Sequence, residues 1–308
     1  MARHGRGGAT PRARVSRDST PLLGEHQTYI TFDAPNGGPP AKPKTPTRLY
    51  QAKQYLNADV SNKHTDIILI ICFAISGLID SGAYNAYTCF TSMQTGNTVF
   101  AALGVSDLPA SSPKYAWTKS VTSVVSFLIG AAVLSTCHRL LGARKRWVQS
   151  ASFFIQGLLI ALSAYIVQRG GSDSPVKKPT IAGLPADPGF PWIDLVPIGL
   201  LSVQSAGKVV ASRIFQHVGL PAVVLTTLFS DLVSDPRLFT AGLFDNPQRN
   251  GRFVAVACYF GGAVAGGAFA KSTVGFAGLL WSVAGIKLLI VISWLLWRED
   301  EEAEDEES

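Results

Sequence analysis

The feature that most constrains this chain is a set of six apolar segments, each about as long as a bilayer crossing. A transmembrane helix needs about 20 predominantly apolar residues. Lipid offers the backbone no hydrogen-bond partners, so such segments have to be helical. The six segments are residues 66–87, 120–141, 147–168, 192–212, 252–270 and 276–297. They predict an all-α membrane protein with six spanning helices.

The overall composition agrees with this prediction. Only 16% of the 308 residues are charged, against about 25% in a soluble domain. A soluble globular enzyme and a disordered chain are both excluded. The net charge of +6 is a sum over tails and loops, so it does not indicate affinity for nucleic acid.

Two further apolar stretches, residues 90–105 and 220–233, are shorter and more polar than the six segments. If neither crosses and the N-terminus is cytoplasmic, the basic cluster of Arg139, Arg144, Lys145 and Arg146 lies on the cytoplasmic side. If both cross, this cluster moves outside, against the positive-inside rule. We therefore expect two short broken or re-entrant segments, six spans and two cytoplasmic termini. The kind of membrane is left open.

The two ends of the chain differ in charge from the apolar body. Residues 1–64 carry ten Lys and Arg and have no apolar core of a signal peptide, which predicts a disordered basic cytoplasmic tail. Its arginine spacing would also suit RNA or an anionic lipid surface, but we favour a solvated tail and expect no nucleic-acid partner. Residues 298–308 predict a solvated acidic cytoplasmic tail.

Cysteines and histidines give no sign of a metal centre or cofactor site. The four cysteines show no CxxC spacing and the five histidines are scattered, so we expect no metal, no cofactor and no disulfide framework. No nucleophile–base arrangement or phosphate-binding loop is recognisable. We therefore expect a protein that is not an enzyme.

The order of the apolar segments repeats along the chain. In residues 66–168 a long apolar segment is followed by a short one and then by two long ones, and residues 192–297 repeat this order. GLIDSGAYNA (77–86) resembles GLLSVQSAGK (199–208), and residues 93–104 weakly resemble residues 224–235. Three crossings per half would insert the second half upside down, which predicts the inverted-repeat helical bundle common in secondary transporters. Chance similarity, or a duplication without transport, remains an alternative.

The short stretches contain polar residues that lipid cannot accommodate. Such residues survive at membrane depth when buried in protein or facing a water-filled cavity. We expect a binding site for a small polar solute; an interfacial loop packed by its threonines is the alternative. The candidate residues are Asn85, Gln94, Thr95, Gly96, Asn97, Gln204, Thr226 and Thr227, with Gln156 as a weaker one.

Two charged residues lie deep inside apolar segments. Asp80 follows an apolar run in the first segment, and Lys287 lies in the middle of the last. An ionised side chain at mid-membrane costs about 2.5–3.5 kcal/mol on insertion scales and therefore needs a partner. We predict an ion pair between Asp80 and Lys287. Asp80 would be either part of the binding site, as a proton or cation site, or one half of a structural pin.

A resemblance to a known family rests on residues 77–104. The Gly77 and Asp80 pair followed by Thr95-Gly96-Asn97 resembles the signature of the YoaK family, multi-pass membrane proteins with a domain of unknown function. Where that pattern has a second Thr-Gly stretch, this chain has Thr226-Thr227. The resemblance implies a fold and a membrane location but no substrate or reaction.

These features together favour a secondary transporter or permease that moves a small polar solute, with a proton carried by Asp80 as an option. The alternative is a non-transporting membrane scaffold that uses its bundle to contact lipid or a partner. In a scaffold, the buried polar groups would satisfy one another.

Overall fold

The computed structural model describes residues 47–108, 115–170, 192–215, 225–242 and 244–298. The chain divides into a first unit, Met1–Thr45, which lies outside the described residues, and a second, Pro46–Ser308, which holds all the described elements. These elements are nine helices, and the described residues contain no strand beyond one isolated bridge. The predicted all-α class is confirmed.

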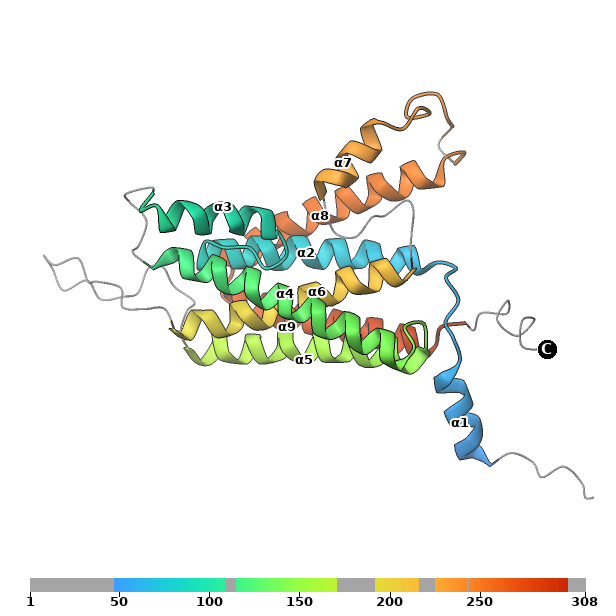
Figure 1. Ribbon diagram of the computed structural model, residues 1–308. Coiled ribbons are helices and arrows are strands. Elements are labelled where there is room, and N and C mark those ends of the chain that lie inside the picture. The colour runs from blue at the N-terminus through green and yellow to red at the C-terminus, as the bar shows by residue number, and fades with distance from the viewer. Residues whose placement is uncertain (1–46, 109–114, 171–191, 216–224, 243, 299–308) are drawn as a thin grey trace, which may run out of the picture. The chain divides into compact units, whose positions relative to one another are not determined.

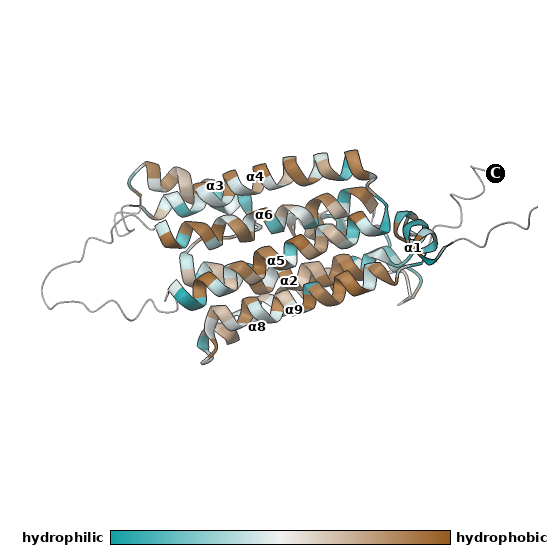
Figure 2. Cartoon of the chain, turned by 90° about the horizontal axis from the view of Figure 1, so that it is seen from below, coloured by the Kyte–Doolittle hydropathy of each residue, from teal (hydrophilic) through white to brown (hydrophobic). Residues whose placement is uncertain are grey.

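Six helices are long and apolar enough to cross a membrane (Figure 1). Large apolar side chains such as Leu128, Ile129 and Phe260 are exposed on their outer faces, and apolar residues run along the whole length of the helices (Figure 2). The protein is thus an integral multi-pass membrane protein. The six helices are α2 (Thr65–Tyr87), α4 (Ala116–Leu141), α5 (Arg146–Gly170), α6 (Trp192–Phe215), α8 (Pro247–Lys271) and α9 (Gly275–Leu295).

Three helices are too short to span. The helix α3 (Gln94–Val105) has 12 residues and packs on α4, and α7 (Leu225–Val233) has nine and packs on α8. At 1.5 Å per residue they reach about 18 Å and about 14 Å, against about 30 Å of hydrocarbon. The third, α1 (Arg48–Asn57), precedes the first span. The predicted short segments are therefore short helices beside the six spans.

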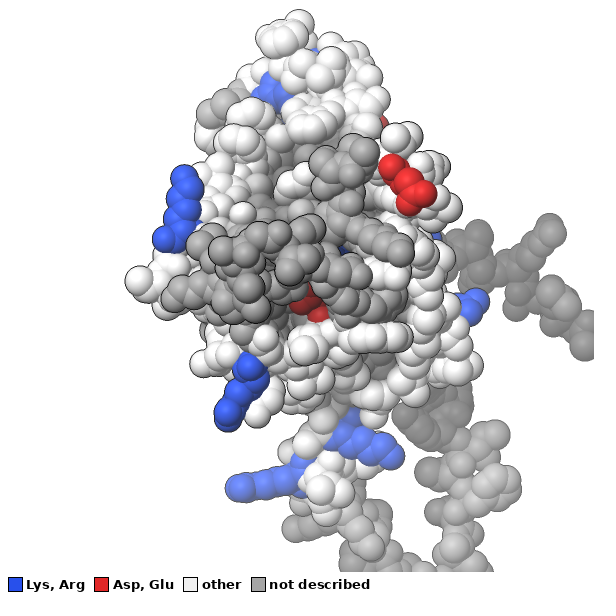
Figure 3. Space-filling view, turned by 90° about the vertical axis from the view of Figure 1, so that its left-hand side faces the viewer, with Lys and Arg blue, Asp and Glu red and all other residues white. Residues whose placement is uncertain are grey.

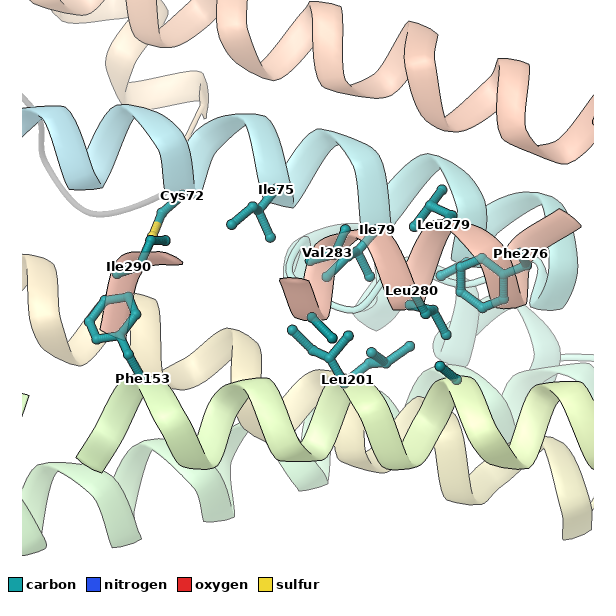
Figure 4. Close-up of a cluster of buried hydrophobic side chains, with 14 of the residues drawn as sticks. Cys72, Ile75, Ile79, Phe153, Leu201, Phe276, Leu279, Leu280, Val283 and Ile290 are labelled. Atoms are coloured by element: carbon teal, nitrogen blue, oxygen red, sulfur yellow. The ribbon is translucent and has the colours of Figure 1, made fainter. Parts of the chain in front are cut away.

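The spanning helices pack in a regular set of pairs. The closest associations are α2 with α8, α4 with α6 and α5 with α9; α6 also contacts α5 and α2, and α9 also contacts α2. Between them lies an apolar core that includes Ile79, Phe153, Leu201, Val283 and Ile290 (Figure 4).

Glycines let α2 and α8 approach to backbone contact. A Cβ on Gly77 would overlap the carbonyl oxygen of Tyr259, and a Cβ on Gly262 would overlap that of Ala74. Gly266 faces the Leu78 carbonyl in the same way. These residues form the small-residue packing face that such spacing favours in membrane helices.

The residues just before α2 are held against the bundle, which corrects the predicted tail boundary at residue 64. Asp59 pairs with Lys145 in an antiparallel bridge, and Val60 N–H donates to the Arg144 carbonyl at 3.0 Å. The Arg146 guanidinium donates to the Tyr55 carbonyl and, at 2.8 Å, to the Trp297 carbonyl. We call Tyr55, residues 58–61, residues 144–146 and Trp297 the terminal clasp.

The terminal clasp shows that the start of α2 and the end of α9 share one end of the bundle. Ser61 accepts from the Trp297 indole at 3.0 Å, and Tyr55 donates to the Leu295 carbonyl at 2.7 Å. Arg146 is 1% exposed and lies 3.7 Å from the Tyr55 ring centroid. Part of the basic cluster therefore binds backbone carbonyls.

Candidate functional site

Asp80 anchors the chain reversal between α2 and α3. It is 2% exposed. Its carboxylate accepts the N–H groups of Thr91 and Ser92, each at 2.9 Å, and both of their hydroxyls, with Thr91 Oγ1 at 3.0 Å. The Tyr259 hydroxyl of α8 donates to it at 3.4 Å. These five donors make Asp80 the organiser of the loop before α3.

Asn97 holds the same loop from the other side. Its Oδ1 accepts Phe90 N–H at 2.9 Å and its Nδ2 donates to the Phe90 carbonyl at 2.8 Å. The amide also reaches Gln94 Oε1 at 3.0 Å and Ser123 Oγ at 2.9 Å. Ser123 continues the chain of hydrogen bonds to Ser202 on α6 at 2.9 Å. The side chain of Asn97 is thus satisfied by protein groups.

Most of the other predicted site residues on α2, α3 and α7 do not join this network. Gly96 packs against the Phe90 ring, where a Cβ would lie 3.2 Å from the ring carbons. The remaining side chains lie exposed on α2, α3 or α7; they are Asn85, Thr95, Thr226 and Thr227. The buried residue of α7 is Leu228, which packs with Phe73 and Ala255 in a separate apolar cluster. The two short stretches therefore do not form facing polar cradles.

Lys287 has a different partner from the one predicted. Its Nζ donates to Gln156 Oε1 on α5 at 2.7 Å and lies 4.6 Å from the Phe153 ring centroid. Asp80 and Lys287 form no ion pair with each other, because α2 directs Asp80 toward Thr91 and Ser92 while α9 directs Lys287 toward α5. Gln156 Nε2 in turn contacts Ser152 at 3.4 Å.

Lys208 is a buried cation within the predicted span of residues 192–212 that the sequence analysis did not single out. The helix α6 continues to Phe215, so Lys208 lies within it and is 1% exposed. Its Nζ donates to the Ser76 hydroxyl of α2, and Ser76 lies one helical turn before Asp80. Lys208 and Asp80 are close enough to attract each other. The three apolar residues 209–211 that follow Lys208 could have indicated its depth.

Gln204 is buried without a hydrogen-bond partner. Neither amide atom of Gln204, 0% exposed, nor the Ser205 hydroxyl beside it has a partner among the described residues. Leaving one such group unpaired costs about 1–3 kcal/mol, so native proteins retain few of them. Gln204 and Lys208 are one turn apart on α6 and share a face.

These groups form a polar centre near the middle of the bundle. We call Ser76, Gln156, Gln204, Lys208 and Lys287, with Asp80 at its border, the central polar cluster. It joins α2, α5, α6 and α9. The described residues hold no group of three His, Cys, Asp or Glu suited to a metal ion.

In contrast to the buried polar cluster, the surface at one end of the bundle carries no concentrated group of charges among the described residues (Figure 3). Lys and Arg among the described residues are scattered over this surface, and most of it is neither acidic nor basic (Figure 3). Near the helix ends, Lys119 is paired with Asp194 at 2.7 Å.

The fold and this centre define a polytopic α-helical membrane protein with a buried polar core. Residues 68–293 match the family described as protein of unknown function (DUF1275). The chain belongs to this family, which agrees with the YoaK-like signature around Asp80 and residues 95–97. No curated protein and no solved structure matches the chain.

Proposed function

We propose that this protein is a secondary transporter or permease of a small polar solute, with its binding site at the central polar cluster. The observation that carries the proposal is the unpartnered, fully buried amide of Gln204 one turn from Lys208. A buried polar group is expected to have a partner, and a transported solute supplies one during part of a cycle. Of the predicted site residues, the proposed site keeps Gln204, with Asp80 at its border, and leaves out residues 94–97.

The pairing of helices supports an inverted repeat. If α2, α3, α4 and α5 correspond to α6, α7, α8 and α9, the α2–α8 contact corresponds to α6–α4. By the same rule α3–α4 corresponds to α7–α8, and α5–α6 corresponds to α9–α2. All of these contacts are present. In inverted-repeat transporters the substrate site lies at the repeat interface near the membrane midplane.

Individual contacts support the same correspondence. Aligning residues 77–86 with 199–208 pairs Asp80 with Ser202. Asp80 contacts Tyr259 on α8 at 3.4 Å, and Ser202 contacts Ser123 on α4 at 2.9 Å. Each contact joins the first helix of one half to the third helix of the other. Both halves contribute side chains to the central polar cluster: Ser76 and Gln156 come from the first half, and Gln204, Lys208 and Lys287 from the second.

A solute-dependent shift in thermal stability tests the proposal. Purified protein is heated with and without each member of a panel of amino acids, sugars, nucleosides, organic acids and inorganic anions, and responding solutes are tested for uptake into reconstituted vesicles. We expect at least one solute to raise the melting temperature and to be taken up. Gln204→Leu should fold, because it removes an unsatisfied amide, but should lose both responses. The matched control is Gln168→Leu, at an exposed position on α5, which should keep both.

A non-transporting scaffold is the second candidate. The fully satisfied network around Asn97 favours it, since polar groups that bind only each other serve packing. If no solute in the panel stabilises the protein and none is taken up, the transporter proposal is overturned and the scaffold is preferred.

A further inference from the structure

The central polar cluster carries more positive than negative charge. Two ammonium groups, Lys208 and Lys287, are buried near the middle of the bundle, and Asp80 is the only buried Asp or Glu among the described residues. Asp80 is already surrounded by Thr91, Ser92 and Tyr259. The Gln156 side chain that binds Lys287 also packs against Gly207, the neighbour of Lys208 on α6. Buried charges of one sign are expected to be compensated by the other.

The donors of the two lysines are only partly used. An ammonium group has three N–H donors. In the described structure Lys208 Nζ has one acceptor, the Ser76 hydroxyl, and Lys287 Nζ has one, the Gln156 carbonyl oxygen. Each lysine thus retains N–H donors for a further acceptor. The two present acceptors, the Ser76 hydroxyl and the Gln156 amide oxygen, are neutral groups, and they compensate a buried cation less well than an anion does.

Gln204 extends this set of donors. Its side-chain amide carries two N–H donors and the Ser205 hydroxyl a third, and none of them has a partner among the described residues. One turn of helix, about 6 Å of rise, separates Gln204 from Lys208. Oxygen atoms of an anion are the acceptors that ammonium and amide donors bind most strongly.

We propose that the transported solute is a small oxyanion, bound by the ammonium groups of Lys208 and Lys287 and by the amide of Gln204. This inference rests on the proposed transport function and specifies its substrate class. Carboxylates and tetrahedral anions such as sulfate or phosphate share the required chemistry. The bound anion would supply the missing negative charge and accept the unused N–H donors.

The test compares probes of different charge on the purified full-length protein. Acetate, succinate, sulfate and phosphate are the anionic probes, with choline and glucose as cationic and neutral ones at matched ionic strength. We expect an anionic probe to raise the melting temperature, and choline and glucose to leave it unchanged. Comparing carboxylates with sulfate and phosphate identifies the anion class. Uptake of the responding anion into vesicles should change with the membrane potential.

Variants locate the binding site. Lys287→Met and Lys208→Met should each weaken binding of the responding anion by about tenfold or more, because a hydrogen bond to a charged group is lost. If Lys208→Met does not fold, Lys208→Gln replaces it, because glutamine removes the charge but keeps N–H donors, and it should also weaken binding. Lys271→Met, at an exposed position at the end of α8, is the matched control and should bind like the natural protein.

The outcomes separate the two proposals. If glucose or choline stabilises the protein through Gln204 while the anions have no effect, the oxyanion inference is wrong and the transporter proposal stands. If anion binding is unchanged in the foldable Lys208 and Lys287 variants, the inference is wrong. If no probe or wider panel member binds, both proposals fall.

Discussion

Lys287 on α9 donates a hydrogen bond of 2.7 Å to the side-chain carbonyl oxygen of Gln156 on α5, and α5 and α9 form one of the three closely packed helix pairs of the bundle. The two residues are 131 positions apart in the chain. The contact makes the buried cation of α9 a link to α5 and leaves Asp80 to organise the loop before α3. Two sets of partners thus replace the single predicted ion pair.

Energetic coupling should follow these observed partners. A double-mutant cycle of Lys287→Met and Gln156→Leu should give a coupling free energy of about 1.5–3 kcal/mol, because one variant alone leaves a buried group unpaired. A cycle of Lys287→Met and Asp80→Asn should be additive within about 0.5 kcal/mol. The measurement is the free energy of unfolding in detergent micelles. Coupling in the second cycle and none in the first would contradict the assignment.

Asn97 should be the most sensitive residue of α3. Asn97→Ala leaves the Phe90 N–H and carbonyl without the side-chain partner that holds them, and we expect a loss of roughly 2–4 kcal/mol of unfolding free energy. Thr95→Ala, on the exposed side of α3, should change it by less than about 0.5 kcal/mol. Thermal unfolding of both purified variants checks the difference. Equal melting temperatures for the two would refute the anchoring role of Asn97.

Two adjacent glycines of α8 should respond differently to alanine. A Cβ on Gly266 would overlap Ser81 Oγ and lie 2.6 Å from the Leu78 carbonyl oxygen, whereas a Cβ on Gly267 meets nothing within 4 Å. Gly266→Ala should push α2 and α8 apart and destabilise the protein by about 1–3 kcal/mol. Gly267→Ala should be neutral or stabilising by up to about 1 kcal/mol, since alanine favours helix. Unfolding of the two variants in micelles is the measurement, and a destabilising Gly267→Ala would contradict the packing.

Arg146 should control the segment that precedes α2. Its guanidinium binds two carbonyls and stacks on Tyr55, a geometry that lysine cannot reproduce. We expect Arg146→Lys to accelerate amide hydrogen exchange in residues 47–62 by about tenfold or more, since an equilibrium shift of about 1.4 kcal/mol is a factor of ten. Arg139→Lys, on the exposed end of α4, is the control. Unchanged exchange in Arg146→Lys would show that the guanidinium does not hold the segment.

The loop between α7 and α8 should loosen in acid. The Arg237 N–H and the Asn246 amide, each 2.9 Å from the Asp235 carboxylate, hold the pKa of Asp235 below its ordinary value of 3.8, with help from Arg252. Because the folded-state pKa is lowered, this stabilisation is present above pH 3.8 and is lost as the pH falls through the lowered value. Hydrogen exchange at the Arg237 amide, corrected for intrinsic rates, should show this step. Asp235→Asn should abolish it, and a step that persists would assign it to another group.

The membrane fold could be predicted from the sequence because it depends on local properties. The length of each apolar run decides whether a helix can span, and the polar residues within 90–105 mark a stretch that does not cross. The four-residue spacing of Gly262 and Gly266 is likewise a local pattern that is typical of close helix packing in membranes. In each case the determining residues are neighbours in the chain.

The partners within the candidate site could not be predicted in the same way. Whether Lys287 meets Asp80 or Gln156 depends on the rotation of α9 about its axis, which only packing against α5 and α2 decides. Lys208 lies within the predicted span of residues 192–212, but its burial and its contact with Ser76 depend on the packing of α6 against α2, which the sequence does not encode locally. Residues 47–62 are ordered by carbonyl contacts to Arg146 across 91 and 151 positions of chain, and no local pattern encodes such contacts.

The terminal clasp also has a consequence for the timing of assembly. Trp297, whose carbonyl binds Arg146 and whose indole binds Ser61, follows the last membrane helix. During synthesis the N-terminal part of the clasp is made first, and its contacts with Trp297 cannot form until all six spans have been made. The clasp can therefore be complete only once Trp297 has been made, and a product that stops before α9 leaves Ser61 and Arg146 without their contacts to Trp297. The clasp thus distinguishes finished molecules from truncated ones at the surface of the membrane.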